Sequence, residues 1–267
     1  MAWIWAAFMP HPPIVVPQVG RGRESEAAAT LAGLRGLQDR LGQLPGNGRP
    51  KVLMILSPHQ PYAPGSLFIN SAPLISGGLG RFGAPEIAFR LQSSPSLEDL
   101  SRHLAGLGLK VASAEAEDLN SDHGTVVPLH FLAQVFGLVP EVVVANPVGL
   151  SPSEALRLGR ALAAWNGEGD SWALLASGDL SHRLSPDGPY GFNPEGPLFD
   201  HEIMEAFKNN TPDELLPDWP PPRLEAAGEC GFRSALAMMG LAGEAVEVLS
   251  HEGPFGVGYG LACWFKR

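Results

Sequence analysis

Three histidines follow predicted strands at nearly the same place in each case, and imidazole is both a common metal ligand and a proton acceptor. His11, His59 and His182 each lie a few residues beyond an apolar run that predicts a buried strand. In open α/β sheets, ligands bind outside the carboxyl ends of the strands. If the three strands are parallel, all three imidazoles project over the same edge of the sheet.

Prolines flank two of these histidines. Pro10 and Pro12 enclose His11, and Pro58 precedes His59. Proline fixes its own φ and restricts the preceding residue to extended backbone, so a histidine held in this way loses little conformational freedom on binding a metal. The alternative is that proline-rich strand ends simply terminate the strands.

A third ligand is needed for an open metal site, and Glu229 is the candidate. It precedes an apolar helical pattern, where a carboxylate also favours the helix N-terminus electrostatically. Two histidines and one carboxylate form the facial triad of non-haem Fe(II) oxygenases. His123 is a fourth histidine, in a turn where Asp122 is expected to cap the following helix.

The remaining patterns predict the elements that position these side chains. Continuous apolar runs are typical of strands covered on both faces, and between them lie amphipathic helical patterns. This alternation predicts an α/β fold with a central mixed or mostly parallel sheet flanked by helices, in one domain spanning 1–267. The predicted strands are Trp3–Met9, Val52–Leu56, Ile87–Leu91, Leu109–Ala112, Val142–Ala145, Trp172–Ala176, Val246–Leu249 and Val257–Phe265. The predicted helices are Glu24–Leu44, Ser96–Leu107, Val127–Phe136, Phe232–Leu241, one that Ser151 opens with a capping box, and one that begins after Thr211.

Three segments rich in glycine or proline are expected to be irregular. Gly77–Gly80 lacks the lysine of a phosphate-binding loop and is interpreted as a loop. Pro217–Pro222 is interpreted as a rigid surface segment. Together with Gly188–Pro197, it is a candidate lid.

Composition excludes several classes of protein. The formal net charge of −10 argues against a nucleic-acid partner. No apolar run approaches the 18 residues of a membrane span, and the N-terminal apolar segment lacks the basic leader of a signal peptide. Two cysteines make no disulfide framework, which fits a reducing cytoplasm.

The ordered motifs together resemble the LigB-like class III extradiol dioxygenase superfamily, and more narrowly its AMMECR1-associated branch, which is related to Memo. The resemblance runs from His11 to Tyr259. The matching segments are Met9–Ile14, Ser57–His59, Asp122–Gly124, Ser177–His182, Gly228–Gly231 and Gly253–Tyr259.

This resemblance implies an enzyme that opens the ring of a small aromatic substrate with O₂. By motif, the Fe(II) ligands of the family fall on His11, His59 and Glu229. The family's acid/base histidine falls on His182, and a second one found in some members falls on His123. The family also implies a homodimer or a pairing with a small second subunit.

The Memo relatives imply an alternative, because they carry a Cys-Gly pair where the dioxygenases carry the glutamate. Here Glu229 is followed directly by Cys230 and Gly231. A thiolate ligand favours zinc or copper over Fe(II). The alternative is therefore a non-enzymatic metal-binding or scaffold protein that works with AMMECR1-like or radical-SAM partners. We expect Glu229 to be the ligand and Cys230 to be a small buried hydrophobe; a zinc-dependent hydrolase using His182 is a third reading.

Overall fold

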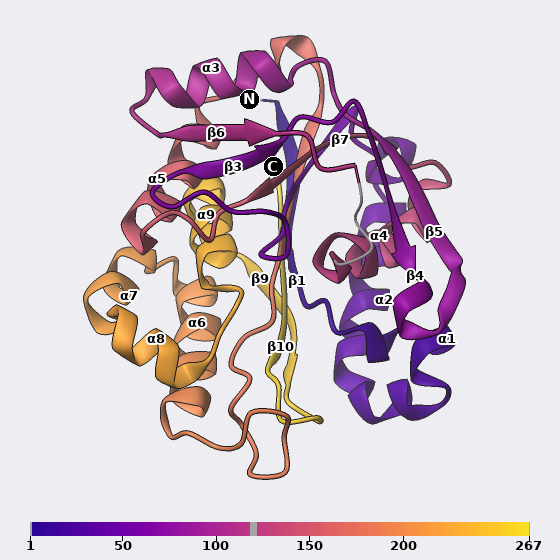
Figure 1. The fold of residues 1–267 in the computed structure, drawn as a ribbon, viewed down its shortest axis with the longest axis vertical. Coiled ribbons are helices and arrows are strands. Elements are labelled where there is room, and N and C mark those ends of the chain that lie inside the picture. The colour runs from indigo at the N-terminus through magenta and orange to yellow at the C-terminus, as the bar shows by residue number, and fades with distance from the viewer. Residues whose placement is uncertain (1, 118–121, 267) are drawn as a thin grey trace.

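An eight-stranded mixed sheet runs through the centre of the molecule (Figure 1). The structure is a computed structural model and describes residues 2–117 and 122–266. The strand order is β6-β3-β7-β2-β8-β1-β10-β9, and β4 and β5 form a separate two-stranded sheet. The strands are β1 (Trp3–Met9), β2 (Val52–Leu56), β3 (Leu67–Asn70), β4 (Leu74–Leu79), β5 (Ala84–Gln92), β6 (Val111–Ala114), β7 (Glu141–Asn146), β8 (Trp172–Ser177), β9 (Glu247–Glu252) and β10 (Tyr259–Phe265).

The middle of the sheet is parallel, as the continuous apolar runs predict. Strand β8 pairs in parallel with β1 on one side and with β2 on the other, and β2 pairs in parallel with β7. Every residue of β2 and β8 is buried, because helices or the small sheet cover both faces. The carboxyl ends of β1, β2 and β8 therefore lie at the same edge of the sheet, which confirms the predicted fold class.

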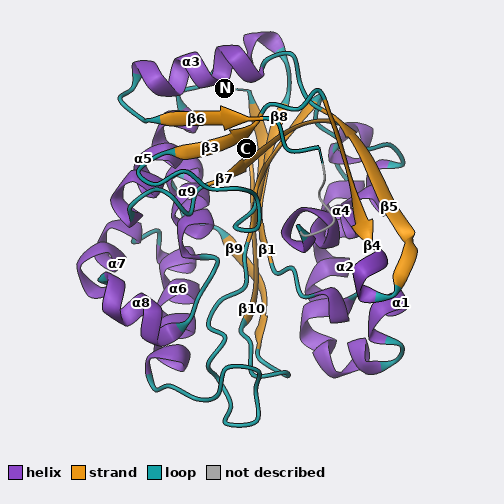
Figure 2. Cartoon of the chain, viewed as in Figure 1, coloured by secondary structure: helices purple, strands orange, loops and turns teal. Residues whose placement is uncertain are grey.

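Two apolar cores lie on the two faces of the sheet (Figure 2). The longer helices of the C-terminal half, with α3, cover one face, and α2 and α4 with the β4–β5 sheet cover the other. The helices are α1 (Pro17–Gly20), α2 (Ala28–Gly42), α3 (Leu97–Gly106), α4 (His123–Phe136), α5 (Pro152–Ala163), α6 (Glu195–Asn209), α7 (Pro212–Asp218), α8 (Pro221–Ala227) and α9 (Phe232–Ala242).

Local capping explains where two of these helices begin. Ser151 forms the expected capping box with Glu154 at the start of α5. Asp122 caps α4 by accepting a hydrogen bond from the backbone N–H of Thr125. The preceding Asn120 and Ser121 of the predicted turn lie outside the described residues.

The loop predicted at Gly77–Gly80 is wrong, because Gly77, Gly78 and Leu79 belong to β4. A Cβ atom on Gly78 would lie only 2.4 Å from the carbonyl oxygen of Ile87 in β5. Glycine is needed here because two backbones approach closely, and not because the chain turns.

The two candidate lid segments contain parts of three helices; α7 is the helix expected after Thr211, whereas α6 and α8 were not predicted. The end of Gly188–Pro197 leads into α6, which begins at Glu195, and Pro217–Pro222 holds the end of α7 and the start of α8. Proline at the first helical positions is compatible with a helix, because the missing N–H has no intrahelical partner there.

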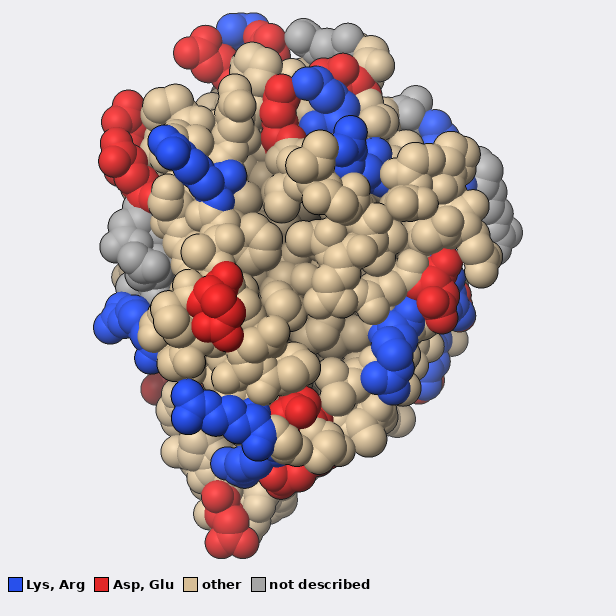
Figure 3. All heavy atoms as spheres, turned by 90° about the vertical axis from the view of Figure 1, so that its right-hand side faces the viewer, with Lys and Arg blue, Asp and Glu red and all other residues tan. Residues whose placement is uncertain are grey.

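No helix in the described residues is long and apolar enough to cross a membrane. On the face drawn in Figure 3, charged side chains of both signs are scattered around a largely uncharged centre. The charge on this face is therefore mixed in sign.

Candidate metal centre

Three imidazoles, those of His11, His59 and His123, converge beyond the carboxyl edge of the sheet; they are called the histidine cluster below. One ring nitrogen from each lies within 4.8 Å of the other two. His11 follows β1, His59 follows β2, and His123 is the first residue of α4. The cluster therefore joins two strand ends to one helix N-terminus.

The spacing of the cluster fits a shared metal ion. The Nε2 atoms of His11 and His59 lie 3.2 Å apart. Two imidazoles that bind one metal at about 2.0–2.1 Å hold their nitrogens roughly 2.9–3.4 Å apart, depending on the coordination angle. Nitrogen donors of this kind suit iron, zinc and copper.

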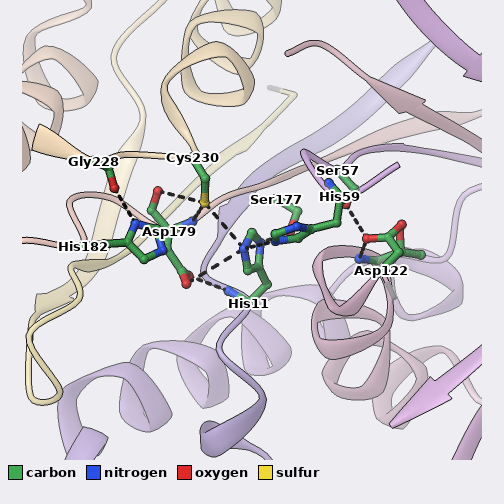
Figure 4. Close-up of polar contacts among 10 residues, drawn as sticks. His11, Ser57, His59, Asp122, Ser177, Asp179, His182, Gly228 and Cys230 are labelled. Carbon is green, nitrogen blue, oxygen red and sulfur yellow. Dashed lines mark hydrogen bonds and ion pairs between the residues drawn. The ribbon is translucent and has the colours of Figure 1, made fainter. Parts of the chain in front are cut away.

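His11 is oriented by residues at the end of β8. The hydroxyl of Ser177 lies 2.9 Å from its Nδ1, and its backbone N–H donates to Asp179 Oδ1 at 2.9 Å. These contacts leave Nε2 facing His59, as Figure 4 shows. Burial, followed by the neighbouring imidazoles, holds the pKa of His11 well below its usual value. The imidazole is thus kept neutral, which is the form that binds a metal.

Asp122 supports the other two histidines through a buried hydrogen-bond network. Its carboxylate accepts from Ser57 Oγ at 2.5 Å, Gln60 Nε2 at 2.5 Å, and the backbone N–H and hydroxyl of Thr125 at 2.9 and 2.6 Å. The backbone N–H of His59 in turn donates to Ser57 Oγ at 3.3 Å. Asp122 therefore ties the end of β2 to the start of α4.

His182 lines the same cavity, on a loop that follows β8. Its Nδ1 lies 2.6 Å from the carbonyl oxygen of Gly228, so Nδ1 carries the ring proton and Nε2 of the neutral ring is a proton acceptor. Burial lowers the pKa of His182, although the hydrogen bond to Gly228 opposes this effect. Tyr190 packs edge-on against this ring, with centroids 5.4 Å apart.

Glu229 lines the cavity but is not a member of the histidine cluster. Its Oε2 accepts the backbone N–H of Phe232 at 2.7 Å, and its Oε1 lies 3.7 Å from the guanidinium of Arg233. Burial raises the pKa of this carboxyl, and the two contacts oppose that rise. The carboxylate thus caps α9, as the electrostatic reading of this turn suggests.

Cys230 is half-buried and its side chain lines the cavity, so it is not the hydrophobe of the protein interior that the sequence interpretation expects. Its Sγ lies 3.6 Å from His11 Nε2 and accepts the backbone N–H of Asp179 at 3.3 Å. Figure 4 shows the sulfur pointing toward His11. Burial raises the pKa of the thiol well above its usual value.

These side chains enclose a cavity of about 470 Å³, within the usual range of small-molecule sites. The sequence patterns missed Ser57 and Ser177 as supports of the histidines, and Arg183 and Tyr190 as lining residues. Each serine immediately follows a predicted strand, and this position is the sequence signal that could have identified it. The lining residues are His11, His59, His123, Asp179, His182, Arg183, Tyr190, Gly228, Glu229 and Cys230.

Comparison with known proteins gives matches that span nearly the whole chain. Residues 5–262 match the family described as catalytic LigB subunit of aromatic ring-opening dioxygenase. Protein CA_C1420 of Clostridium acetobutylicum is 34% identical over 276 residues, which cover 95% of this chain and 56% of that relative. This chain thus spans about half the length of that relative.

A solved structure shares the fold. The crystal structure of uncharacterized protein JW3007 from Escherichia coli is similar with a TM-score of 0.62. The similarity covers 97% of this chain and 99% of that chain, at 17% sequence identity.

Proposed function

Because the chain belongs to the LigB family of catalytic subunits of aromatic ring-opening dioxygenases, we propose that it is a non-haem, Fe(II)-dependent extradiol dioxygenase. Its substrate would be a catechol or a related small phenolic, which it cleaves with O₂. The observation that carries this proposal is the convergence of three imidazoles in a cavity that His182 also lines.

In this proposal His11, His59 and His123 hold the metal. His11 and His59 are the histidine ligands that the family resemblance assigns, and His123, which that resemblance makes a second acid/base, takes the place of Glu229. The donor set fits, because the three nitrogens converge and burial lowers the pKa of His11 and His59. When bound, Fe(II) supplies the Lewis acidity and the open coordination positions that ring cleavage with O₂ requires.

His182 is the proposed general base. The Gly228 carbonyl holds the proton on Nδ1, so Nε2 accepts a proton from a catechol hydroxyl. Because burial lowers the pKa of His182, the ring is neutral and ready to accept that proton at neutral pH. The imidazolium that results returns the proton as the ring opens.

The test is to load anaerobically purified protein with Fe(II), add a panel of catechols, and then admit O₂. Oxygen uptake with a yellow ring-opened product supports the proposal, and a His182→Gln variant is expected to lose turnover while still binding iron. Iron-loaded protein that turns over no catechol in a broad panel contradicts it.

A second candidate function is supported by Cys230, whose sulfur lies 3.6 Å from His11 Nε2. In that case the protein is a Memo-like metal-binding scaffold for AMMECR1-like or radical-SAM partners, and the metal is zinc or copper. Metal content of wild-type protein and of a Cys230→Ser variant, purified without chelator, separates the two. A copper or zinc site lost in Cys230→Ser favours the scaffold, and iron retained in that variant favours the dioxygenase.

A further inference from the structure

Asp200 brings a buried carboxylate to the segment that carries His182. It lies in α6, and only 2% of its side chain is exposed. One oxygen, Oδ1, accepts the backbone N–H of Ser181 at 2.8 Å, so Asp200 holds the residue directly before His182. The other oxygen, Oδ2, lies 3.1 Å from Nε2 of His251 in β9. The carboxylate therefore links an edge strand of the sheet to the backbone beside the proposed general base.

Gly258 makes room for this carboxylate. A Cβ atom on Gly258 would overlap Oδ2 of Asp200, so only glycine leaves space for the acid here. The backbone of Gly258 also pairs with the segment before His182. Its N–H donates to the carbonyl of Ser181 at 2.7 Å, and its carbonyl accepts the N–H of Leu180 at 2.8 Å. Ser181 is thus held on both sides, and the position of His182 depends on Asp200.

The charge of Asp200 acts on the His182 ring. Taking a carboxylate out of water is costly even when it is paired, so stability alone is a weak reason for an acid at this position. Burial raises the pKa of Asp200, and its contacts with His251 and with the N–H of Ser181 oppose that rise. Burial also lowers the pKa of His182, whereas the Gly228 carbonyl and the charge of Asp200 raise it. The carboxylate therefore favours the protonated ring.

Other titratable groups face the same two side chains. Asp179 is close enough to Asp200 for the charge of Asp200 to raise its pKa. The His182 ring faces the cavity. The other charged or titratable side chains that line this cavity are His11, His59, His123, Asp179, Arg183, Tyr190, Glu229 and Cys230. A test of Asp200 must therefore leave all of these residues in place.

We propose that Asp200 is a positioning residue for His182 and that His251 is its counter-charge. Asp200 fixes the backbone of Ser181 and places a negative charge near the His182 ring. The side chain of His251 is 35% exposed, so it meets the solvent, and its imidazolium offsets the charge of Asp200. The pair thus adjusts how strongly His182 holds a proton. The positioning of a general base rests on the proposed function, whereas the effect of this charge on the His182 ring does not.

The test is an NMR titration of the His182 ring in the zinc-loaded protein, with its signal assigned as the one that His182→Gln lacks. Asp200→Asn keeps the shape and an oxygen that accepts from Ser181 but removes the charge, so the pH midpoint of the His182 signal should move down. His251→Gln keeps an N–H donor for Asp200 but removes the counter-charge, so the midpoint should move up. The two variants are therefore expected to shift the same signal in opposite directions.

Two exposed positions supply matched controls. Asp213→Asn removes a negative charge at the start of α7, and His201→Gln replaces the neighbour of Asp200 on α6. Neither should move the His182 midpoint. A mutation that merely loosens the fold exposes His182 and raises its pKa, because burial lowers it. A downward shift in Asp200→Asn therefore cannot come from loosening.

A midpoint that is unchanged or raised in Asp200→Asn, or a His182 ring that does not titrate, overturns the inference while leaving the proposed function standing. If Asp200→Asn does not fold, the comparison of His251→Lys with His251→Gln decides. Lysine keeps a positive charge, so its midpoint should be the lower of the two, and equal midpoints overturn the inference. A downward shift in Asp200→Asn, in a protein whose iron-loaded form turns over no catechol, supports the role of Asp200 and contradicts the dioxygenase. In an iron-loaded enzyme that does turn over, the acid limb of the pH profile of kcat should move down with the midpoint.

Discussion

Replacing Asp122 by asparagine tests whether the buried network around that residue holds the histidine cluster. The carboxylate accepts four hydrogen bonds from three residues, and only 2% of Asp122 is exposed. An asparagine oxygen at the Oδ1 position still accepts from Ser57 and from the backbone of Thr125. Its amide group at the Oδ2 position meets the hydroxyl of Thr125, which can rotate, and the amide nitrogen of Gln60, which is a donor.

The cost follows from the Gln60 contact. The Gln60 side chain cannot flip without losing the 3.1 Å hydrogen bond that its Oε1 accepts from Asn70. The charge-assisted hydrogen bond from Gln60 is therefore lost, and the other contacts no longer involve a charged group. A hydrogen bond to a charged group contributes about 1.5–3 kcal/mol. We expect Asp122→Asn to lower the free energy of unfolding by about 2–4 kcal/mol in total. Because Ser57 and the start of α4 shift with it, zinc affinity should fall about 10- to 100-fold.

The assays are urea unfolding followed by circular dichroism, and calorimetric titration with Zn²⁺. Asp99→Asn is the matched control, because Asp99 lies in the first turn of α3 and pairs with exposed Arg102 at 2.5 Å. Exposed ion pairs contribute about 0–1 kcal/mol, so this variant should behave like the wild type. An Asp122→Asn protein with wild-type zinc affinity and a loss of stability no larger than the control would refute the reasoning.

Three further predictions address the cluster, its pH response and its packing. Alanine at each position of the histidine cluster should reduce the affinity for zinc or iron at least tenfold, whereas alanine at exposed His201 should not. Metal analysis that finds full occupancy in any variant of the cluster contradicts this ligand set. Burial lowers the pKa of His130, so the stability that its neutral ring provides is present above pH 6.5 and is lost as the pH falls toward the folded-state pKa. His130→Gln should therefore flatten the acid side of a plot of Tm against pH. A curve for His130→Gln that runs parallel to the curve for His201→Gln would contradict this. In Gly178→Ala the new Cβ would lie 2.2 Å from the Cα of Gly231, so we expect the free energy of unfolding to fall by about 1–3 kcal/mol in thermal unfolding. Gly42 has open space around it, so Gly42→Ala should lose no stability. Equal stability of the two variants would disprove the close contact.

The central strands were predictable from sequence, because β2 is apolar at every position and β8 at every position but the last, Ser177, and a strand buried on both faces is typically a continuous apolar run. Strand β4 was not, because Gly78 permits the close approach of Ile87, and a glycine-rich segment has the same composition whether it forms a turn or pairs with a strand. Packing against a partner strand is a non-local property that local composition does not report.

The candidate site was likewise only partly predictable from the sequence. His11 and His59 were found because each follows a strand end, and the parallel sheet brings those ends together. The approach of His123 depends on how α4 packs, and the direction of Glu229 and Cys230 depends on backbone angles within one turn. Adjacent residues in a turn point in different directions, so spacing alone left open which of the two faces His11.

The position of β8 between β1 and β2 has a consequence for the order of events during folding. Strand β1 ends at Met9 and β2 at Leu56, but each pairs with β8, which ends only at Ser177. During synthesis, β1 and β2 cannot pair with β8 until more than a hundred further residues have left the ribosome. Both strands are apolar, and they do not pair with each other. Such non-local pairing slows folding and leaves apolar strand edges open to aggregation. His11 and His59 therefore come together late in folding, when β8 inserts between β1 and β2.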